Sequence, residues 1–226
     1  METPQRTAAP TYGASDHYDA RYFAWQNADI DVKTRIKVRY FAPYVKRTDT
    51  VVDFGCAGGG MLAGLDCARR IGIEINDVAR AAAAADHGIE AYASTALVPD
   101  EVADVVVSNH ALEHIEAPID ALRQLRPKAK PDGKLVLVLP IDDWRAQRRW
   151  DPDDINRHLY TWTPLLLGNA LDEAGWRPVR MKVVRRTLMR GFAQFSKLPE
   201  PVFDGLQAVY SRVRHRQELL AVARPR

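Results

Sequence analysis

Short apolar runs alternate with helical segments along most of the chain, and polar residues rarely interrupt the runs. Such runs are typical of strands buried on both faces of a parallel sheet. The segments between them are long enough to form right-handed crossover helices. The sequence therefore predicts an α/β fold with a doubly wound, mostly parallel sheet and helices on both faces. The expected strands are 50–54, 70–75, 89–92, 103–108, 134–139, 178–186 and 218–223.

Prolines and glycines mark the expected ends of several helices. Pro118 lies in the first turn of one segment with helical periodicity, and Pro164 in the first turn of another. Gly88 follows an Ala-rich segment, as expected of a residue that ends a helix. The expected helices are 29–44, 61–68, 77–87, 118–128 and 163–175, and Pro131-Asp132-Gly133 predicts a turn.

The length of 226 residues suits one α/β domain with a modest appendage. We expect a tail and a cap helix over 1–48, followed by a ligand-binding domain over 49–226 with basic C-terminal strands. No apolar stretch approaches the roughly 20 residues that span a bilayer, and the polar first residues do not suggest a signal peptide. Cys56 and Cys67 are expected to be free thiols, and the protein to be cytoplasmic.

The net charge of +3 hides an asymmetry along the chain. Residues 177–226 hold 12 Lys and Arg against 3 Asp and Glu, a balance of +9 that leaves −6 elsewhere. Such an asymmetry often reflects a partner of opposite charge, although a solvated basic face is equally consistent with it. Arg180 and Lys182 could share one face of a strand, and Arg212, Arg214 and Arg216 could form a second basic stripe.

A glycine-rich turn follows the first expected strand, in the order Val51-Val52-Asp53-Phe54-Gly55-Cys56-Ala57-Gly58-Gly59-Gly60. Glycines allow a ligand to approach the backbone closely, and the helix behind the turn offers free N–H groups. Glu74 ends the next strand, where a carboxylate can accept hydrogen bonds from ribose hydroxyls. Turn and carboxylate together indicate a nucleotide-type ligand.

Gly55-x-Ala57-x-x-Gly60 also fits the dinucleotide fingerprint. The carboxylate of Asp53, two residues before the first glycine, would repel a pyrophosphate. It suits a ligand with an ammonium group and no phosphate. An oxidoreductase that uses a nicotinamide cofactor stays open as an alternative.

Asp53-x-Gly55-x-Ala57-x-Gly59, Glu74 and the stretch Ser108-Asn109-His110-Ala111-Leu112-Glu113-His114 resemble the hallmarks of small-molecule class I methyltransferases that use S-adenosylmethionine (SAM). The similarity covers about 51–175, and Ala57 stands where the family often has Gly. It implies a seven-stranded sheet whose last strand is antiparallel. The cofactor-binding residues that it implies are Asp53, Gly55, Cys56, Ala57, Gly58, Gly59, Glu74, Ile75, Ser94, Thr95, Ser108 and Asn109.

The resemblance implies in-line methyl transfer from the sulfonium, in which the enzyme mainly aligns the reactants and excludes water. An alcohol acceptor also needs a base. His158, His114 and His110 are the candidates, because imidazole titrates near neutral pH, although each could simply be a packing residue. His158 could instead bind the acceptor. No Cys/His cluster has the spacing of a zinc site, so no metal is expected.

The segment after the fifth strand is the expected acceptor site, because ligands of such sheets bind beyond the carboxyl ends of the strands. It interleaves carboxylates with aromatics around Trp144, Trp150 and Tyr160. We therefore expect a small polar acceptor, anionic or carbohydrate-like, such as a sugar or glycoconjugate precursor, methylated on oxygen. A nucleic-acid methyltransferase is a less favoured alternative, since Asn109 lacks a following Pro-Pro-aromatic run. A catalytically silent SAM-binding module is a further alternative.

Overall fold

The computed structural model describes residues 30–142, 149–184, 192–195 and 197–226, which include one seven-stranded sheet. Its strand order is β3-β2-β1-β4-β5-β7-β6. Neighbouring strands from β3 to β5 pair in parallel, and β7 is antiparallel to both β5 and β6. The predicted fold class is confirmed. The strands are β1 Thr50–Phe54, β2 Arg69–Ile73, β3 Glu90–Tyr92, β4 Ala103–Asn109, β5 Ala129–Ile141, β6 Trp176–Val184 and β7 Gln217–Pro225.

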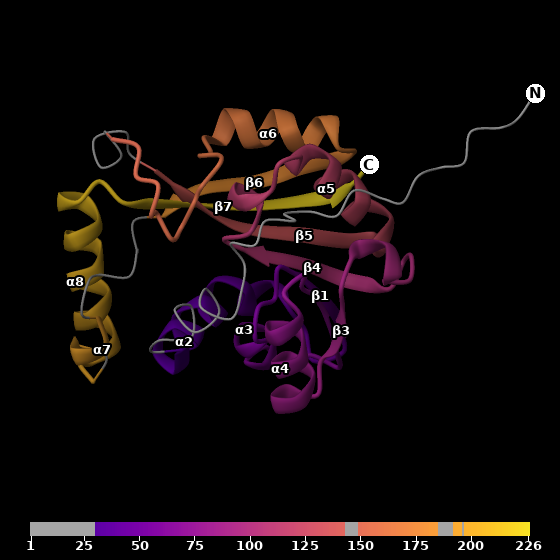
Figure 1. Cartoon of the computed structure of the whole chain (residues 1–226), viewed down its shortest axis with the longest axis horizontal. Coiled ribbons are helices and arrows are strands. Elements are labelled where there is room, and N and C mark those ends of the chain that lie inside the picture. Colours follow the sequence, from indigo (N-terminus) through magenta and orange to yellow (C-terminus); the bar gives the residue numbers. More distant parts are fainter. Residues whose placement is uncertain (1–29, 143–148, 185–191, 196) are drawn as a thin grey trace, which may run out of the picture.

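Helices cover both faces of the sheet, with α5 and α6 on one side and α2, α3 and α4 on the other (Figure 1). The side chains of β5 alternate between the two cores that lie on opposite faces of the sheet. Leu135, Leu137 and Leu139 pack in the core under α5 and α6, and Val136 and Val138 pack in the opposite core. The α-helices are α2 Ile30–Phe41, α3 Gly60–Ala63, α4 Asp77–His87, α5 Pro118–Leu125, α6 Pro164–Glu173, α7 Phe192–Phe195 and α8 Glu200–Val213.

Local capping explains why α4 matches its predicted bounds. The Asn76 side chain accepts hydrogen bonds from the N–H groups of Val78 and Ala79 at the start of the helix. Gly88 ends it in the left-handed conformation, with φ of 63°. Helix α6 begins in a similar way, because the Thr163 hydroxyl accepts the N–H of Leu166.

Three predictions of local structure are wrong. Pro131-Asp132-Gly133 belongs to β5, where a shift in the pairing with β4 accommodates the extra residues, instead of a turn before the strand. Helix α3 ends at Ala63, short of the predicted Ala68. Helix α8 was not predicted, and its end places Arg212 in a helical turn. The proposed basic stripe of Arg212, Arg214 and Arg216 therefore lacks the strand geometry on which it was based.

The carboxyl ends of β1 to β5 form one edge of the sheet, and β7 begins at the same edge because it runs the opposite way. Helix α2 borders this edge: its Tyr40 hydroxyl donates to Glu218 at 2.6 Å. Arg39 of α2 binds both carboxylate oxygens of Asp204 in α8. Two helices remote in sequence thus flank the edge where a ligand is expected.

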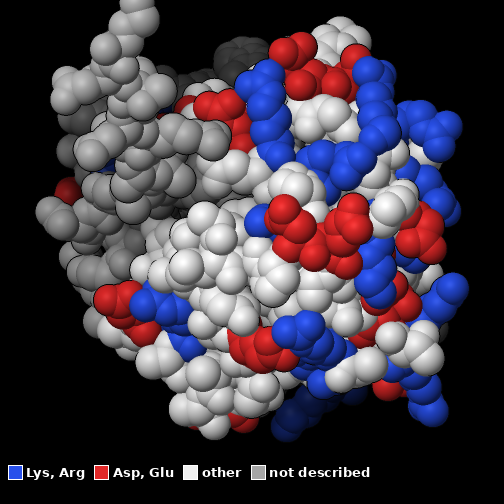
Figure 2. Space-filling model, turned by 90° about the vertical axis from the view of Figure 1, so that its right-hand side faces the viewer, with Lys and Arg blue, Asp and Glu red and all other residues white. Residues whose placement is uncertain are grey.

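Figure 2 shows the side of the molecule that lies opposite α8. Basic and acidic side chains are interspersed on this side, so it has no large patch of one charge. Among the helices of the described residues, none is both long and apolar enough to cross a membrane.

Candidate active site

The turn after β1 adopts conformations that few side chains tolerate. Gly55, Ala57 and Gly59 all have positive φ, of 77°, 48° and 80°. A Cβ on Gly55 would lie 2.6 Å from the Cβ of Ala111, so glycine is required by both conformation and space. Ala57 adopts the left-handed conformation despite its methyl group. The turn thereby exposes backbone at the carboxyl edge of the sheet.

Glu74 follows β2 and reaches the same turn. One of its carboxylate oxygens accepts the N–H of Ala57 at 2.9 Å, and the other accepts the N–H of Asn76 at 2.9 Å. Burial raises the pKa of Glu74, although these backbone donors oppose the rise. Ile75, next in the chain, is an exposed apolar side chain beside the carboxylate. This arrangement offers a polar contact for a ribose and an apolar one for a base.

Asp53 lies at the end of β1 with only 2% of its surface exposed. Its Oδ1 has no hydrogen-bond donor within the described parts of the chain. Burial raises the pKa of Asp53 to about 7; Lys37 of α2 opposes the rise and Glu74 adds to it. A buried carboxylate with an unused oxygen is suited to receive a ligand's ammonium group.

Among the other predicted cofactor residues, some are half-buried at the edge of the sheet and others are buried. Gly58 and Asn109 are half-buried at the edge. Thr95 is fully buried with a hydroxyl that makes no hydrogen bond to described residues, and Ser94 precedes it. Cys56 packs under the turn, and burial keeps its pKa far above the usual range. The Ser108 hydroxyl is committed to the carbonyl of Phe54 at 2.8 Å, where it ties β4 to β1.

A second group of polar side chains lies at the ends of β4 and β5. His110, with φ of 53°, places its Nε2 atom 3.3 Å from Glu218 of β7. Its Nδ1 atom lies 3.7 Å from Oε1 of Glu113. Glu218 also accepts the Tyr40 hydroxyl. His110 is therefore held between two carboxylates that come from different segments.

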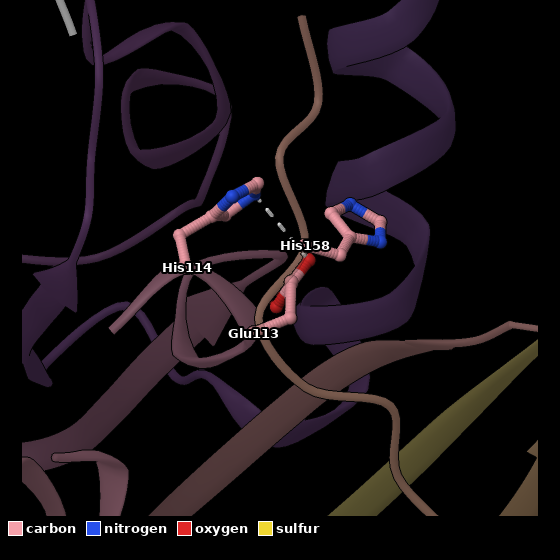
Figure 3. Close-up of side chains that lie close together, drawn as sticks. All are labelled: Glu113, His114 and His158. Carbon is pink, nitrogen blue, oxygen red and sulfur yellow. Dashed lines mark ion pairs between the residues drawn. The ribbon is translucent and has the colours of Figure 1, made fainter. Parts of the chain in front are cut away.

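His114 and His158 come together although 44 positions separate them in the chain. Their rings contact edge to face, with centroids 5.0 Å apart. Asp142, just after β5, lies 2.7 Å from Nδ1 of His158. The backbone N–H groups of Leu159 and Tyr160 donate to the carbonyl of Glu113, which fixes the His158 segment against His114. Figure 3 shows the Glu113 carboxylate between the two imidazoles.

The three candidate histidines are thus brought into one cluster with Glu113. Burial alone would lower the pKa of His158, but its hydrogen bond to Asp142 and the nearby carboxylates raise it on balance. Burial raises the pKa of Glu113. Asp142 belongs to the segment predicted to hold the acceptor, although no role was predicted for it. Lys37, Tyr40 and Glu218 were not predicted as site residues, because they lie in segments that only the fold brings together.

The expected acceptor segment is described only in part. Trp144 and Arg145 lie outside the described residues. Trp150 is 88% exposed, so it does not line a closed pocket in this structure. Trp162, in contrast, is buried beside Tyr160, with ring centroids 6.1 Å apart.

Comparison with known proteins identifies the family. Residues 24–180 match the model of the methyltransferase domain family, so the chain belongs to that family. It is 30% identical over 136 residues to a probable methyltransferase, ltbC, of Aspergillus luteorubrus. That match covers 50% of this chain and 48% of the relative, so the chain spans about half the length of the curated relative that it matches.

Solved structures show the same fold. A SAM-dependent methyltransferase from Archaeoglobus fulgidus has a TM-score of 0.61 and 21% identity, with 90% of this chain and 99% of that one covered. A putative methyltransferase of Haloferax volcanii, solved in complex with the activator Trm112, has a TM-score of 0.63 and 18% identity over 90% and 97% of the two chains. The predicted methyltransferase family and the class I fold are confirmed.

Proposed function

We propose that the protein transfers a methyl group from SAM to an oxygen of a small polar acceptor, of the sugar or glycoconjugate-precursor kind. The observation that carries this proposal is the histidine–carboxylate cluster at the same sheet edge as the donor-binding turn. A hydroxyl acceptor has to lose a proton during methyl transfer. The cluster provides imidazole groups, His110 among them, that can receive that proton.

The residues around the turn after β1 fit SAM. Asp53, with its unused buried oxygen, would hold the ammonium group of the methionyl part. Glu74 would accept the ribose hydroxyls, and the segment at Ser94 and Thr95 would flank the adenine beside Ile75. SAM supplies an electrophilic methyl group on a sulfonium, and the bond's electron pair stays with sulfur as a neutral thioether.

The residues around His158 would act on the acceptor. Asp142 fixes the ring orientation of His158, and Glu218 does the same for His110. The acceptor oxygen gains the methyl group, and its proton passes to an imidazole of the cluster. The basic residues of 177–226 favour an anionic acceptor, because positive surface raises the local concentration of anions.

Direct binding measurements test the donor half. Asp53→Ala and Glu74→Ala should each weaken SAM binding at least tenfold, about 1.4 kcal/mol, by isothermal titration. Asp86→Ala, on the exposed side of α4, is the matched control and should bind like wild type. SAM should also raise the melting temperature of the wild type. If neither SAM nor its demethylated product binds or shifts the melting temperature, the assignment of the donor site is wrong.

Turnover of a panel of sugars and nucleotide-sugars tests the acceptor half. His158→Ala should lower turnover at least tenfold while leaving SAM affinity unchanged, because His158 lies in the acceptor half. His87→Ala, exposed at the end of α4, should retain full turnover. SAM binding without turnover of any acceptor would favour a silent module. Tight, strongly salt-dependent binding to RNA would favour a nucleic-acid substrate.

A further inference from the structure

Glu113 is a buried carboxylate whose charge is compensated only in part, through nearby imidazoles at distances longer than a hydrogen bond. Its surface is 0% exposed, and neither of its oxygens accepts a hydrogen bond from the described residues. An isolated carboxylate in such a place is costly unless it is paired or binds a metal. The contacts closest to pairing are His110 at 3.7 Å and His114 at 3.8 Å, both longer than a hydrogen bond.

Two imidazoles converge on that carboxylate. One potential ligand atom from each of Glu113, His114 and His158 lies within 4.8 Å of the other two (Figure 3). Two ligands at about 2.1 Å from a zinc ion, at the tetrahedral angle, are roughly 3.4 Å apart. The 3.8 Å between Glu113 and His114 is close to that value. His158 would have to move its free ring nitrogen inward to complete three sides of a tetrahedron.

The surroundings of His158 match those of a metal-binding histidine. Histidine ligands usually donate their second ring N–H to a carboxylate, which fixes the ring. Asp142 is placed for this role at Nδ1, which leaves Nε2 as the ligand atom. The backbone contacts of Leu159 and Tyr160 with Glu113 hold the two halves of the cluster together.

We propose that Glu113, His114 and His158 form a binding site for a divalent transition metal ion of the zinc class. Two imidazoles and one carboxylate are a ligand set of zinc and non-haem iron sites, and three protein ligands leave a position open for water or substrate. Spacing in the sequence does not reveal the site, because His158 lies 44 positions after His114. His110 is outside the ligand set and stays available to the acceptor. Any use of the metal in catalysis rests on the proposed function, but metal binding does not.

The test is titration of the full, chelator-treated chain with Zn²⁺, and with Co²⁺ as a spectroscopic probe. Wild type should bind one equivalent of Zn²⁺ with a dissociation constant of micromolar or tighter. Co²⁺ should give the visible absorption of a low-symmetry nitrogen–oxygen site. His114→Ala and His158→Ala should each weaken Zn²⁺ binding at least tenfold, and His87→Ala should not. Glu113→Gln, nearly identical in shape, should weaken it without unfolding the chain.

Circular dichroism and SAM titration of the same samples separate the possible failures. A folded wild type that binds Zn²⁺ no more tightly than the His114→Ala/His158→Ala double variant overturns the metal site, as does equal loss in His87→Ala. If SAM binding and turnover persist in that case, the methyltransferase proposal stands. If Zn²⁺ binds as expected but SAM does not, the donor assignment fails and the metal site stands.

Discussion

At the scale of single residues, the ionisation of Asp53 bears directly on the proposed donor site. Burial raises its pKa to about 7, so the folded, donor-free protein holds a proton there that an unfolded chain releases near pH 4. A donor ammonium would instead favour the ionised carboxylate. Donor binding below pH 7 should therefore release a proton.

The raised pKa of Asp53 should make both SAM affinity and donor-free stability depend on pH. SAM affinity should rise by up to tenfold per pH unit as the pH approaches 7, and then level off. Donor-free stability should fall as pH rises from about 4 to 7, because the folded state binds the extra proton in that window. The difference in unfolding free energy between Asp53→Asn and wild type should therefore favour the variant more at pH 8 than at pH 4. The shift should be at least about 1 kcal/mol, or 2–4 °C in melting temperature.

Calorimetric titration in buffers of different ionisation enthalpy, together with melting curves of wild type and Asp53→Asn, would check both. A flat SAM affinity from pH 5.5 to 7.5 would contradict the raised pKa. Lys37 contributes to the same balance, because burial lowers its pKa while the buried carboxylates Asp53, Glu113 and Glu218 oppose that change.

The proximity of Glu74 to the turn after β1 was predictable from sequence because both follow neighbouring strands. Gly55 to Gly59 form one turn, and Glu74 ends the adjacent strand, so strand order alone brings them together. The acceptor half was predictable only as separate histidines. Glu218 reaches His110 through the pairing of β5 with β7, a long-range contact that no spacing encodes. Asp142 reaches His158 because the chain after β5 returns to the end of that strand. The surroundings of Glu113 likewise depend on the distant segment at Leu159 and Tyr160, which hydrogen-bonds to its carbonyl.

At the scale of secondary-structure elements, the strands and α4 were predictable because apolar runs and capping residues agree. Helix α8 was not predicted because its sequence does not show a continuous helical pattern. Pro201 and Gly205 interrupt a helical reading, and its aliphatic residues are largely exposed instead of facing the core. Those exposed residues are Val202, Leu206, Val209 and Val213, at 39% to 69% exposure.

Ion pairs link helix α2 to α8, and their contribution can be tested. Arg39 binds Asp204 through two hydrogen bonds, of 3.1 and 2.7 Å, and contacts Glu200 at 2.9 Å. Arg39→Ala should cost about 1 kcal/mol of unfolding free energy, because a partly buried bidentate pair is lost. Hydrogen exchange should increase in α2 and α8 and remain unchanged in β1 and β4.

The matched control is Arg47→Ala. Arg47 pairs with Asp66, but the two side chains are 86% and 71% exposed, so solvent screens the pair. Its removal should change stability by less than about 0.3 kcal/mol. Equal effects of the two substitutions would show that Arg39 does not fasten α2 to α8.

At the scale of the whole molecule, the separation of charge along the chain predicts how an acceptor arrives. Residues 177–226 carry a balance of +9, and the exposed Arg180 and Lys182 lie on edge strand β6. Arg185, Arg186 and Arg190 are outside the described residues. An anionic acceptor should be attracted, and the attraction should weaken when salt shortens the range of the field to about 8 Å.

The specificity constant for the true acceptor should therefore fall severalfold between low and physiological ionic strength, with turnover at saturation unchanged. Steady-state kinetics across a salt series would measure this, with SAM binding at each salt concentration as the control. An alternative role for the arginines is to keep edge strand β6 from pairing with other molecules. A neutral acceptor turned over equally well at all salt concentrations would favour that role.

The position of β7 between β5 and β6 has a consequence for how the chain is made. A ribosome has to synthesise residues 217–225 before β6 gains its neighbour, because β6 precedes them and is separated from them by the segment that contains α7 and α8. Until then the nascent chain presents the unpaired edge of β5 together with an unattached β6. Strands β1 to β5 are all synthesised before β7, so their pairing does not have to wait for it, whereas the contact of Glu218 with His110 does.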